Sequence, residues 1–141
     1  MKITICTWMG IAGSFIAGLF GGWSSGMTTL LICMAADYMS GLVIAGVFKK
    51  SPKSESGALE SRAGFKGLCR KGMALLFVLI AYRLDLTLGT EYIKDAVIIG
   101  FISNELISII ENAGVMGLPV PKKLKQAIDM LKEREEKNEK E

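Results

Sequence analysis

Three ionisable side chains stand inside long apolar stretches of the chain. Asp37, Arg83 and Glu105 each lie ten or eleven residues into such a stretch, which is a depth of about 15 Å in a helix. That depth is the middle of a hydrocarbon core about 30 Å thick, where an isolated charge is costly. We therefore predict an intramembrane ion cluster of these three residues. The alternative is that Arg83 extends outward to the membrane surface and Asp37 is protonated.

A polar stripe follows one face of the segment that contains Glu105. The five residues fall at i, i+1, i+4, i+7 and i+8, which is one side of a helix: Asn104, Glu105, Ser108, Glu111 and Asn112. One acid at mid-membrane costs about 2.5–3.5 kcal/mol, close to what the large apolar residues of the segment contribute. Such a helix needs protein or water on its polar face. Two interpretations remain open, a pore-lining face in an oligomer and a polar seam that locks a four-helix monomer.

The chain offers no set of residues typical of catalysis or metal binding. It contains no histidine, and Cys6, Cys33 and Cys69 are too far apart in sequence for a CxxC motif. It has neither a GxSxG nucleophile motif nor a phosphate-binding loop. We therefore predict that the protein is not an enzyme and uses neither a metal ion nor a cofactor.

The distribution of charge predicts an all-α integral membrane protein. Half of the residues are hydrophobic, and Asp37 is the single charged residue between Lys2 and Lys49. We expect about four membrane-spanning helices, arranged as two hairpins, at about 3–22, 27–48, 72–89 and 95–111. The loop 49–71 has seven basic residues against two acidic ones. Because basic loops stay in the cytoplasm, both termini are expected there; a three-span alternative would leave one basic cluster outside.

Small residues recur every four positions in the first predicted span. These rows are typical of helices whose backbones approach closely in lipid, and they comprise Gly13, Ala17, Gly18, Gly21 and Gly22. One interpretation is homo-oligomerisation through this helix. The other is packing on the second span within one chain.

The C-terminal part, 119–141, is predicted to be a charged cytoplasmic tail after a membrane domain at 1–118. Pro119 ends the fourth span and Pro121 is placed to begin a new helix. Apolar residues follow at helical spacing, at Leu124, Ala127, Ile128 and Leu131. The basic residues beside them are Lys122, Lys123 and Lys125. We expect a short amphipathic helix on anionic lipid headgroups, with a solvated tail beyond Lys132.

Four motifs occur in order between Ala36 and Leu131. They are ADYMSG (36–41), GFKGLCRK (64–71), NELISIIENA (104–113) and GLPVPKKLKQAI (117–128). Together they resemble the phage lysis and toxin-secretion holin family of Gram-positive bacteria and their phages, and the last motif is the most specific.

The resemblance implies a function that residue spacing does not show. Holins accumulate in the bacterial cytoplasmic membrane and oligomerise abruptly. The resulting lesions let an endolysin reach the peptidoglycan, or let toxins out, for timed host lysis. The implied partners are the lipid bilayer and other copies of the chain, with endolysin as a functional partner without direct contact and no nucleic acid. The alternatives are a small four-span proton-coupled transporter and an antiholin or membrane scaffold.

Overall fold

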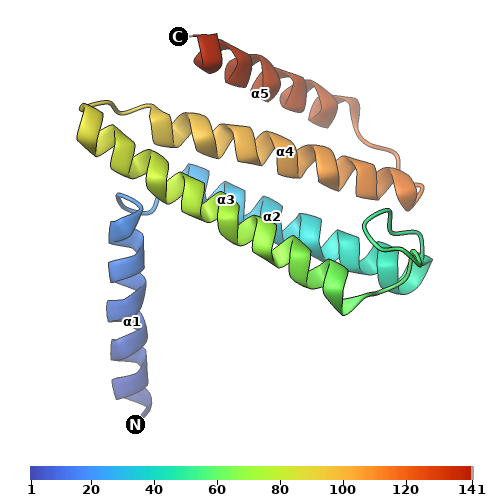
Figure 1. Cartoon of the computed structure of the whole chain (residues 1–141), viewed down its shortest axis with the longest axis horizontal. Coiled ribbons are helices and arrows are strands. Elements are labelled where there is room, and N and C mark those ends of the chain that lie inside the picture. Colours follow the sequence, from blue (N-terminus) through green and yellow to red (C-terminus); the bar gives the residue numbers. More distant parts are fainter. Residues whose placement is uncertain (141) are drawn as a thin grey trace.

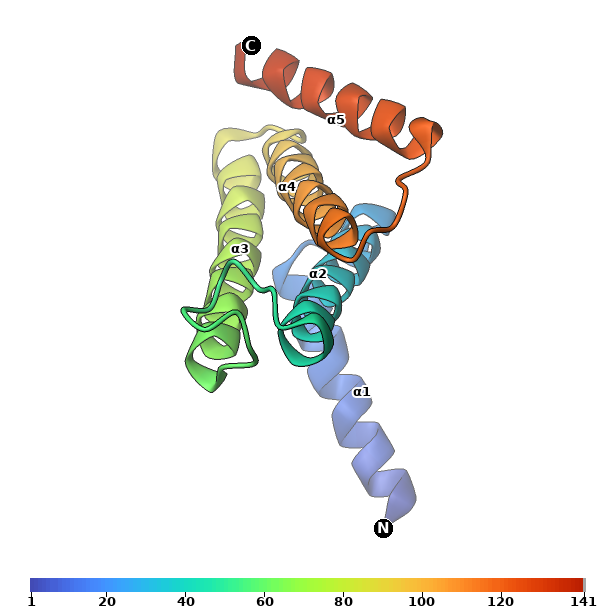
Figure 2. The ribbon, with the colours of Figure 1, turned by 90° about the vertical axis from the view of Figure 1, so that its right-hand side faces the viewer.

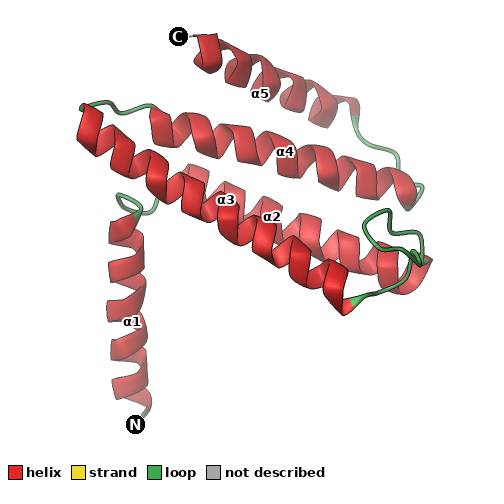
Figure 3. Cartoon of the chain, in the orientation of Figure 1, coloured by secondary structure: helices red, strands yellow, loops and turns green. Residues whose placement is uncertain are grey.

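A computed structural model describes residues 1–140, and this part of the chain is helical with connecting turns and loops and without strands (Figures 1 and 3). The helices are α1 (Lys2–Leu19), α2 (Ser25–Val43) with a π-helical continuation (Ile44–Phe48), α3 (Ser61–Leu88), α4 (Ile93–Val115) and α5 (Lys122–Lys140). The all-helical prediction is thereby confirmed for the described residues. Two helices are long and apolar enough to cross a membrane, α1 and the continuous helix Ser25–Phe48. The four-span count stays a prediction.

The centre of the fold is α4, which contacts α2, α3 and α5 (Figure 2). Helix α2 runs parallel to α4 and α3 runs antiparallel to both, and α2 and α3 contact each other less than either contacts α4. The core between the three helices is apolar, and Leu30 of α2, Val78 of α3 and Ile98 of α4 are at most 2% exposed. Burial of these side chains stabilises each helix pair by about 1.5–3 kcal/mol per residue.

Helix α1 projects away from this bundle (Figures 1 and 2). None of its residues is buried, and a Cβ atom added at Gly10, Gly13 or Gly18 would meet nothing within 4 Å. The structure therefore does not contain the packing of this segment on the second span. Gly21 and Gly22, predicted to extend the helical rows of small residues, lie after α1 in a turn with φ of 76° and 92°. Glycine tolerates these positive φ values without strain, so both residues serve the turn.

The turn after α1 is fixed to the far end of the bundle. A Cβ on Gly21 would come within 2.3 Å of the Tyr82 ring. Lys94 donates a hydrogen bond to the carbonyl oxygen of Phe20 and lies 5.4 Å from the centre of the Tyr82 ring. The C-terminal end of α1 is therefore held, while the remainder of the helix is not buried by any other part of residues 1–140.

Asp85, which interrupts the third predicted span, caps the next helix. Its Oδ1 accepts hydrogen bonds from the Thr90 hydroxyl (2.6 Å) and the Ile93 amide (3.0 Å), and its Oδ2 accepts one from the Lys94 amide (2.8 Å). A carboxylate in this position satisfies the free amides at a helix N-terminus and favours its dipole. Asp85 thus fixes the α3–α4 turn rather than simply weakening a span.

Helix α5 folds back along α4 (Figures 1 and 2). Ile128 is 4% exposed, and Leu131 packs against the bundle core. The predicted amphipathic segment is therefore helical, but its apolar face lies on α4. The helix also continues to Lys140, beyond Lys132, where a solvated tail was predicted; residue 141 of that predicted tail lies outside the described residues. The three basic residues predicted to face the membrane surface are exposed, namely Lys122, Lys123 and Lys125.

Candidate functional site

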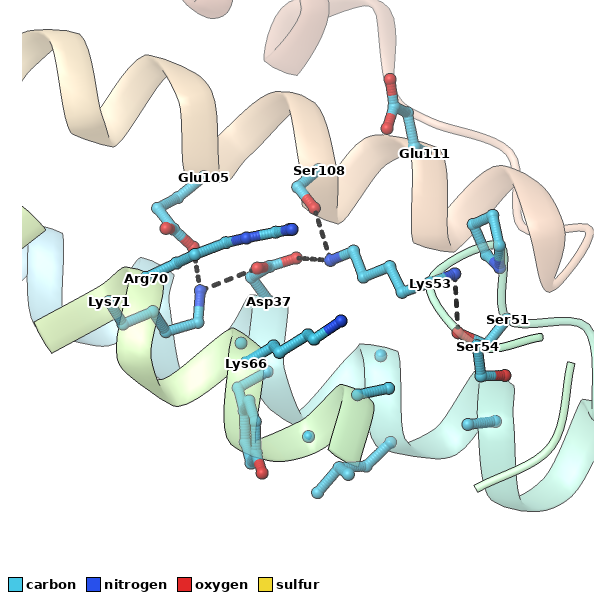
Figure 4. Close-up of a pocket in the computed structure, with 18 of the residues that line it drawn as sticks. Asp37, Ser51, Lys53, Ser54, Lys66, Arg70, Lys71, Glu105, Ser108 and Glu111 are labelled. Carbon is cyan, nitrogen blue, oxygen red and sulfur yellow. Dashed lines mark hydrogen bonds and ion pairs between the residues drawn. The ribbon is translucent and has the colours of Figure 1, made fainter. Parts of the chain in front are cut away.

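One ammonium group joins the three helices of the bundle (Figure 4). Lys71 Nζ on α3 lies 2.8 Å from Asp37 Oδ2 on α2 and 2.6 Å from Glu105 Oε2 on α4. Their side chains are 15%, 7% and 9% exposed. We call these three residues the Lys71 cluster. Lys71 therefore adds a polar bridge between α2 and α3 to the packing that these helices make with α4.

A second set of polar groups satisfies the remaining atoms of Asp37. Asn112 Nδ2 donates hydrogen bonds to Asp37 Oδ1 (3.2 Å) and to Ser40 Oγ (2.8 Å). Lys53, from the loop between α2 and α3, lies 3.8 Å from Asp37 Oδ1 and donates to Ser108 Oγ (3.4 Å). Two carboxylates therefore face two ammonium groups. Balanced and hydrogen-bonded charges of this kind lower the burial penalty, whereas removing one partner is strongly destabilising.

The polar stripe of α4 divides between two environments. Glu105 and Asn112 are buried and Ser108 is half-buried, at i, i+7 and i+3 on one helix face. All three take part in the contacts to α2, α3 and the loop described above. Asn104 and Glu111 are exposed. The inward part of the stripe thus has the geometry of a polar seam within one chain, and the pore-lining interpretation stays a prediction.

The predicted ion cluster differs from the structure in its basic member. Arg83 is exposed and makes no ion pair within residues 1–140, and Lys71 takes the predicted place beside Asp37 and Glu105. The reason is the register of the α3–α4 hairpin. Counted outward from the shared turn at 89–92, Glu105 faces about residue 76, within reach of the long Lys71 side chain, whereas Arg83 faces about residue 98. A depth that is counted from the start of each predicted span does not show which residues of α3 and α4 face each other.

The sequence motifs converge on this site. Asp37 comes from ADYMSG, Lys71 from GFKGLCRK, and Glu105 and Asn112 from NELISIIENA. The glycines of the second motif have a packing role, because a Cβ on Gly64 would lie 3.2 Å from the Tyr38 hydroxyl on α2. The motifs therefore specify how α2, α3 and α4 meet. The fourth motif, GLPVPKKLKQAI, forms the link into α5 and its first turns.

A cleft of about 740 Å³ opens beside the Lys71 cluster. Its walls come from α2, α3, α4 and the 49–60 loop, and the basic side chains in them are Lys53, Lys66, Arg70 and Lys71. Within residues 1–140 no group of three or more His, Cys, Asp or Glu side chains is arranged to hold a metal ion. The cleft therefore combines these four basic side chains with four carboxylates, of which Asp37 and Glu105 are paired with Lys71 and the other two are Glu60 and Glu111.

Comparison with known proteins identifies relatives along most of the chain. A protein of Halalkalibacterium halodurans is 42% identical over 90% of this chain and 93% of its own length. An uncharacterized protein of Listeria monocytogenes is 41% identical over 82% and 78%, and a 14.9 kDa protein of Clostridium perfringens is 36% identical over 84% and 86%. No solved structure matches the chain.

The model of the bacteriophage holin family matches residues 14–133. The match spans the Lys71 cluster, the cleft and most of α5, and it confirms the resemblance carried by the four motifs. Together with the two long apolar helices, it indicates a holin-like membrane protein, in a family that is not enzymatic. The chain belongs to the bacteriophage holin family.

Proposed function

We propose that the protein acts as a holin. It accumulates in the bacterial cytoplasmic membrane, assembles with copies of itself and opens lesions that release an endolysin or toxins. The observation that carries this proposal is α1, an apolar helix of 18 residues without a buried residue. Trp8 is 68% exposed and Phe15 is also 68% exposed, and apolar surface of this extent needs lipid or protein to cover it.

Open glycine positions favour a second copy as one of the partners of α1. Within the described part of one chain, a Cβ added at Gly10, Gly13 or Gly18 would meet nothing within 4 Å. In lipid, helices associate where small residues allow their backbones to come close. A helix that is fixed at its base and free along its length can present this surface to a neighbouring molecule without unfolding the bundle.

We propose a topology of four spans with both termini in the cytoplasm. The basic loop between α2 and α3 stays inside, so α1 and α2 form one hairpin and α3 and α4 form the other. The membrane domain is then 1–118 and the cytoplasmic tail 119–141. This placement puts the Lys71 cluster inside the membrane domain, where its paired charges avoid the penalty of isolated ones.

The proposed topology requires α5 to leave α4. Helix α5 carries seven basic and five acidic residues, and a single charge at mid-membrane already costs about 2.5–3.5 kcal/mol. A helix of this composition is stable on α4 only where water reaches it. We propose that the packed form precedes full insertion, and that α5 moves to the headgroup surface as α4 enters the bilayer.

Induced expression in bacteria tests the proposal. With a cytoplasmic endolysin present, a holin produces abrupt lysis at a fixed time, and without endolysin it still depolarises the membrane. Resistance to toxic compounds, with the membrane potential intact, would support a transporter instead. Intact cells and an unchanged potential, despite verified membrane accumulation, would support an antiholin or scaffold.

A further inference from the structure

The cleft beside the Lys71 cluster gathers cationic side chains that the cluster does not use. Lys66 and Arg70 extend from α3 into this cleft, and Lys53 enters it from the loop (Figure 4). Within residues 1–140, neither Lys66 nor Arg70 takes part in an ion pair. Lys53 makes one contact with Asp37, at 3.8 Å. The cleft therefore presents two uncommitted cations and a third that is weakly held.

Within residues 1–140, the carboxylates in the same walls form no ion pair with Lys66 or Arg70. Asp37 and Glu105 are paired with Lys71. Glu60 accepts hydrogen bonds from the amide (3.1 Å) and hydroxyl (2.6 Å) of Ser56, and the hydroxyl contact is the main favourable interaction that holds the pKa of Glu60 below its ordinary value. Figure 4 shows Glu111 pointing away from the cationic groups.

The arrangement suits an anion with several oxygen atoms. A guanidinium offers a planar pair of donors that matches phosphate, and lysine ammonium groups add further donors. The cleft also has apolar walls, because Leu42 and Leu59 line it while being 37% and 61% exposed. A ligand that joins a phosphate to an apolar group would use both kinds of surface.

We propose that this cleft binds the phosphate of an anionic phospholipid of the cytoplasmic leaflet through Lys53, Lys66 and Arg70. The assignment of the leaflet rests on the topology proposed above, which places the 49–60 loop at the inner surface. Basic pockets between helices on that side are suited to anionic headgroups. Because Lys53 also contacts Asp37, a bound phosphate competes with that carboxylate and links lipid binding to the Lys71 cluster.

Native mass spectrometry of the full chain in detergent tests the site. The protein is titrated with phosphatidylglycerol, phosphatidylcholine or inorganic phosphate, and bound molecules per chain are counted. The unaltered protein is expected to retain phosphatidylglycerol in preference to the other two. The double variant Lys66→Gln/Arg70→Gln is expected to bind phosphatidylglycerol about thirtyfold more weakly, given the contribution of each basic residue near an anionic headgroup.

The control is Lys50→Gln/Arg62→Gln, which removes the same charge from exposed residues outside the cleft. It should retain the affinity of the unaltered protein. Equal losses in both double variants would mean that only net charge matters, and would overturn the site. Equal retention of phosphatidylcholine, or displacement of the lipid by inorganic phosphate at the same concentration, would also overturn it. Mass spectrometry measures lipid binding and not lysis. Lipid binding by a chain that fails to lyse cells would therefore refute the holin proposal and leave the lipid site standing.

Discussion

The two terminal helices have opposite relations to the bundle. Within residues 1–140, helix α1 is apolar and has no buried residue, whereas α5 is highly charged and packs along α4 (Figure 1). In water the apolar helix would be the one to gain from packing, and in a bilayer the charged helix would be the one excluded. Neither environment alone suits both helices.

In the function proposed above, this difference separates the helices that form the fold from the helix that meets other copies of the chain. The contacts that define the fold lie in α2, α3 and α4, and α5 adds Ile128 and Leu131 to them. By contrast, α1 contributes its basal turn, where Lys94 and Gly21 fix it to the bundle. We infer that on assembly α1 contacts another copy of the chain, and that α5 loses its contact with α4. Substitutions in the bundle, in α1 and in α5 should therefore change different measurements.

The largest effect is expected at the residue that holds the bundle together. Lys71→Met leaves Asp37 and Glu105 buried without their shared cation, which typically destabilises a protein by about 3–5 kcal/mol. The variant should fail to accumulate and should unfold earlier in denaturant. Arg83→Met removes the same charge from an exposed position of the same helix and should be close to neutral. Equal stability of the two variants would remove the Lys71 cluster as the bridge between α2 and α3.

The next effect concerns α1 and should leave the bundle intact. Gly13→Leu/Gly18→Leu fills space that is open within one chain, so the unfolding transition should not move. Self-association in vesicles should weaken by about tenfold, equivalent to about 1.4 kcal/mol, because the α1 backbones can no longer approach closely. Energy transfer between labelled copies measures this self-association. In cells, lysis should be delayed. Ala12→Leu, an exposed position, is the control. Unchanged association of the glycine variant would assign assembly to another surface.

Much of this division follows from local sequence patterns. Long apolar runs predict α1 and α2, and Pro119 and Pro121 correctly mark the break before α5. Asp37 and Glu105 are identifiable as candidate buried acids because each interrupts an apolar run. Their basic partner was predicted wrongly, since a helix depth counted from each span's own start ignores the hairpin register that brings Lys71 to Glu105. Tertiary contacts set that register, including the Asp85 cap at the α3–α4 turn.

The position of α5 could not be predicted from its composition. The apolar spacing of Leu124, Ile128 and Leu131 shows that one face must be covered, but it does not distinguish a lipid surface from a protein surface. The answer depends on α4, whose outer face leaves room at Gly100 for the Glu135 side chain. Complementarity of this kind appears only when two distant segments are placed together.

A smaller effect is expected where α5 meets α4. Ile128→Ser removes the one buried side chain of α5 and should weaken its packing by about 1.5–3 kcal/mol. Limited proteolysis of the tail in detergent should become faster. If release of α5 is a step before lesion formation, lysis should occur earlier. Met130→Ser, at a position 69% exposed, should change neither. Later lysis in the Ile128 variant would instead show that the α5–α4 contact is needed for the lesion.

The smallest effect is expected at Gly100, and its size measures how tightly the two helices fit. A Cβ there would lie 2.8 Å from Glu135 Oε1, which is the mobile end of a long side chain. Alanine also favours the helical state of α4 by about 1 kcal/mol relative to glycine. The two contributions oppose each other, so Gly100→Ala should shift the free energy of unfolding by less than about 1 kcal/mol.

Gly100→Leu adds bulk that a carboxylate movement cannot accommodate, and it should expose the tail to protease as Ile128→Ser does. If the tail of the Gly100→Leu variant were as resistant to protease as the tail of the unaltered chain, α5 would not lie against Gly100 in detergent. The contrast between a packed α5 and an unpacked α1 would then be lost.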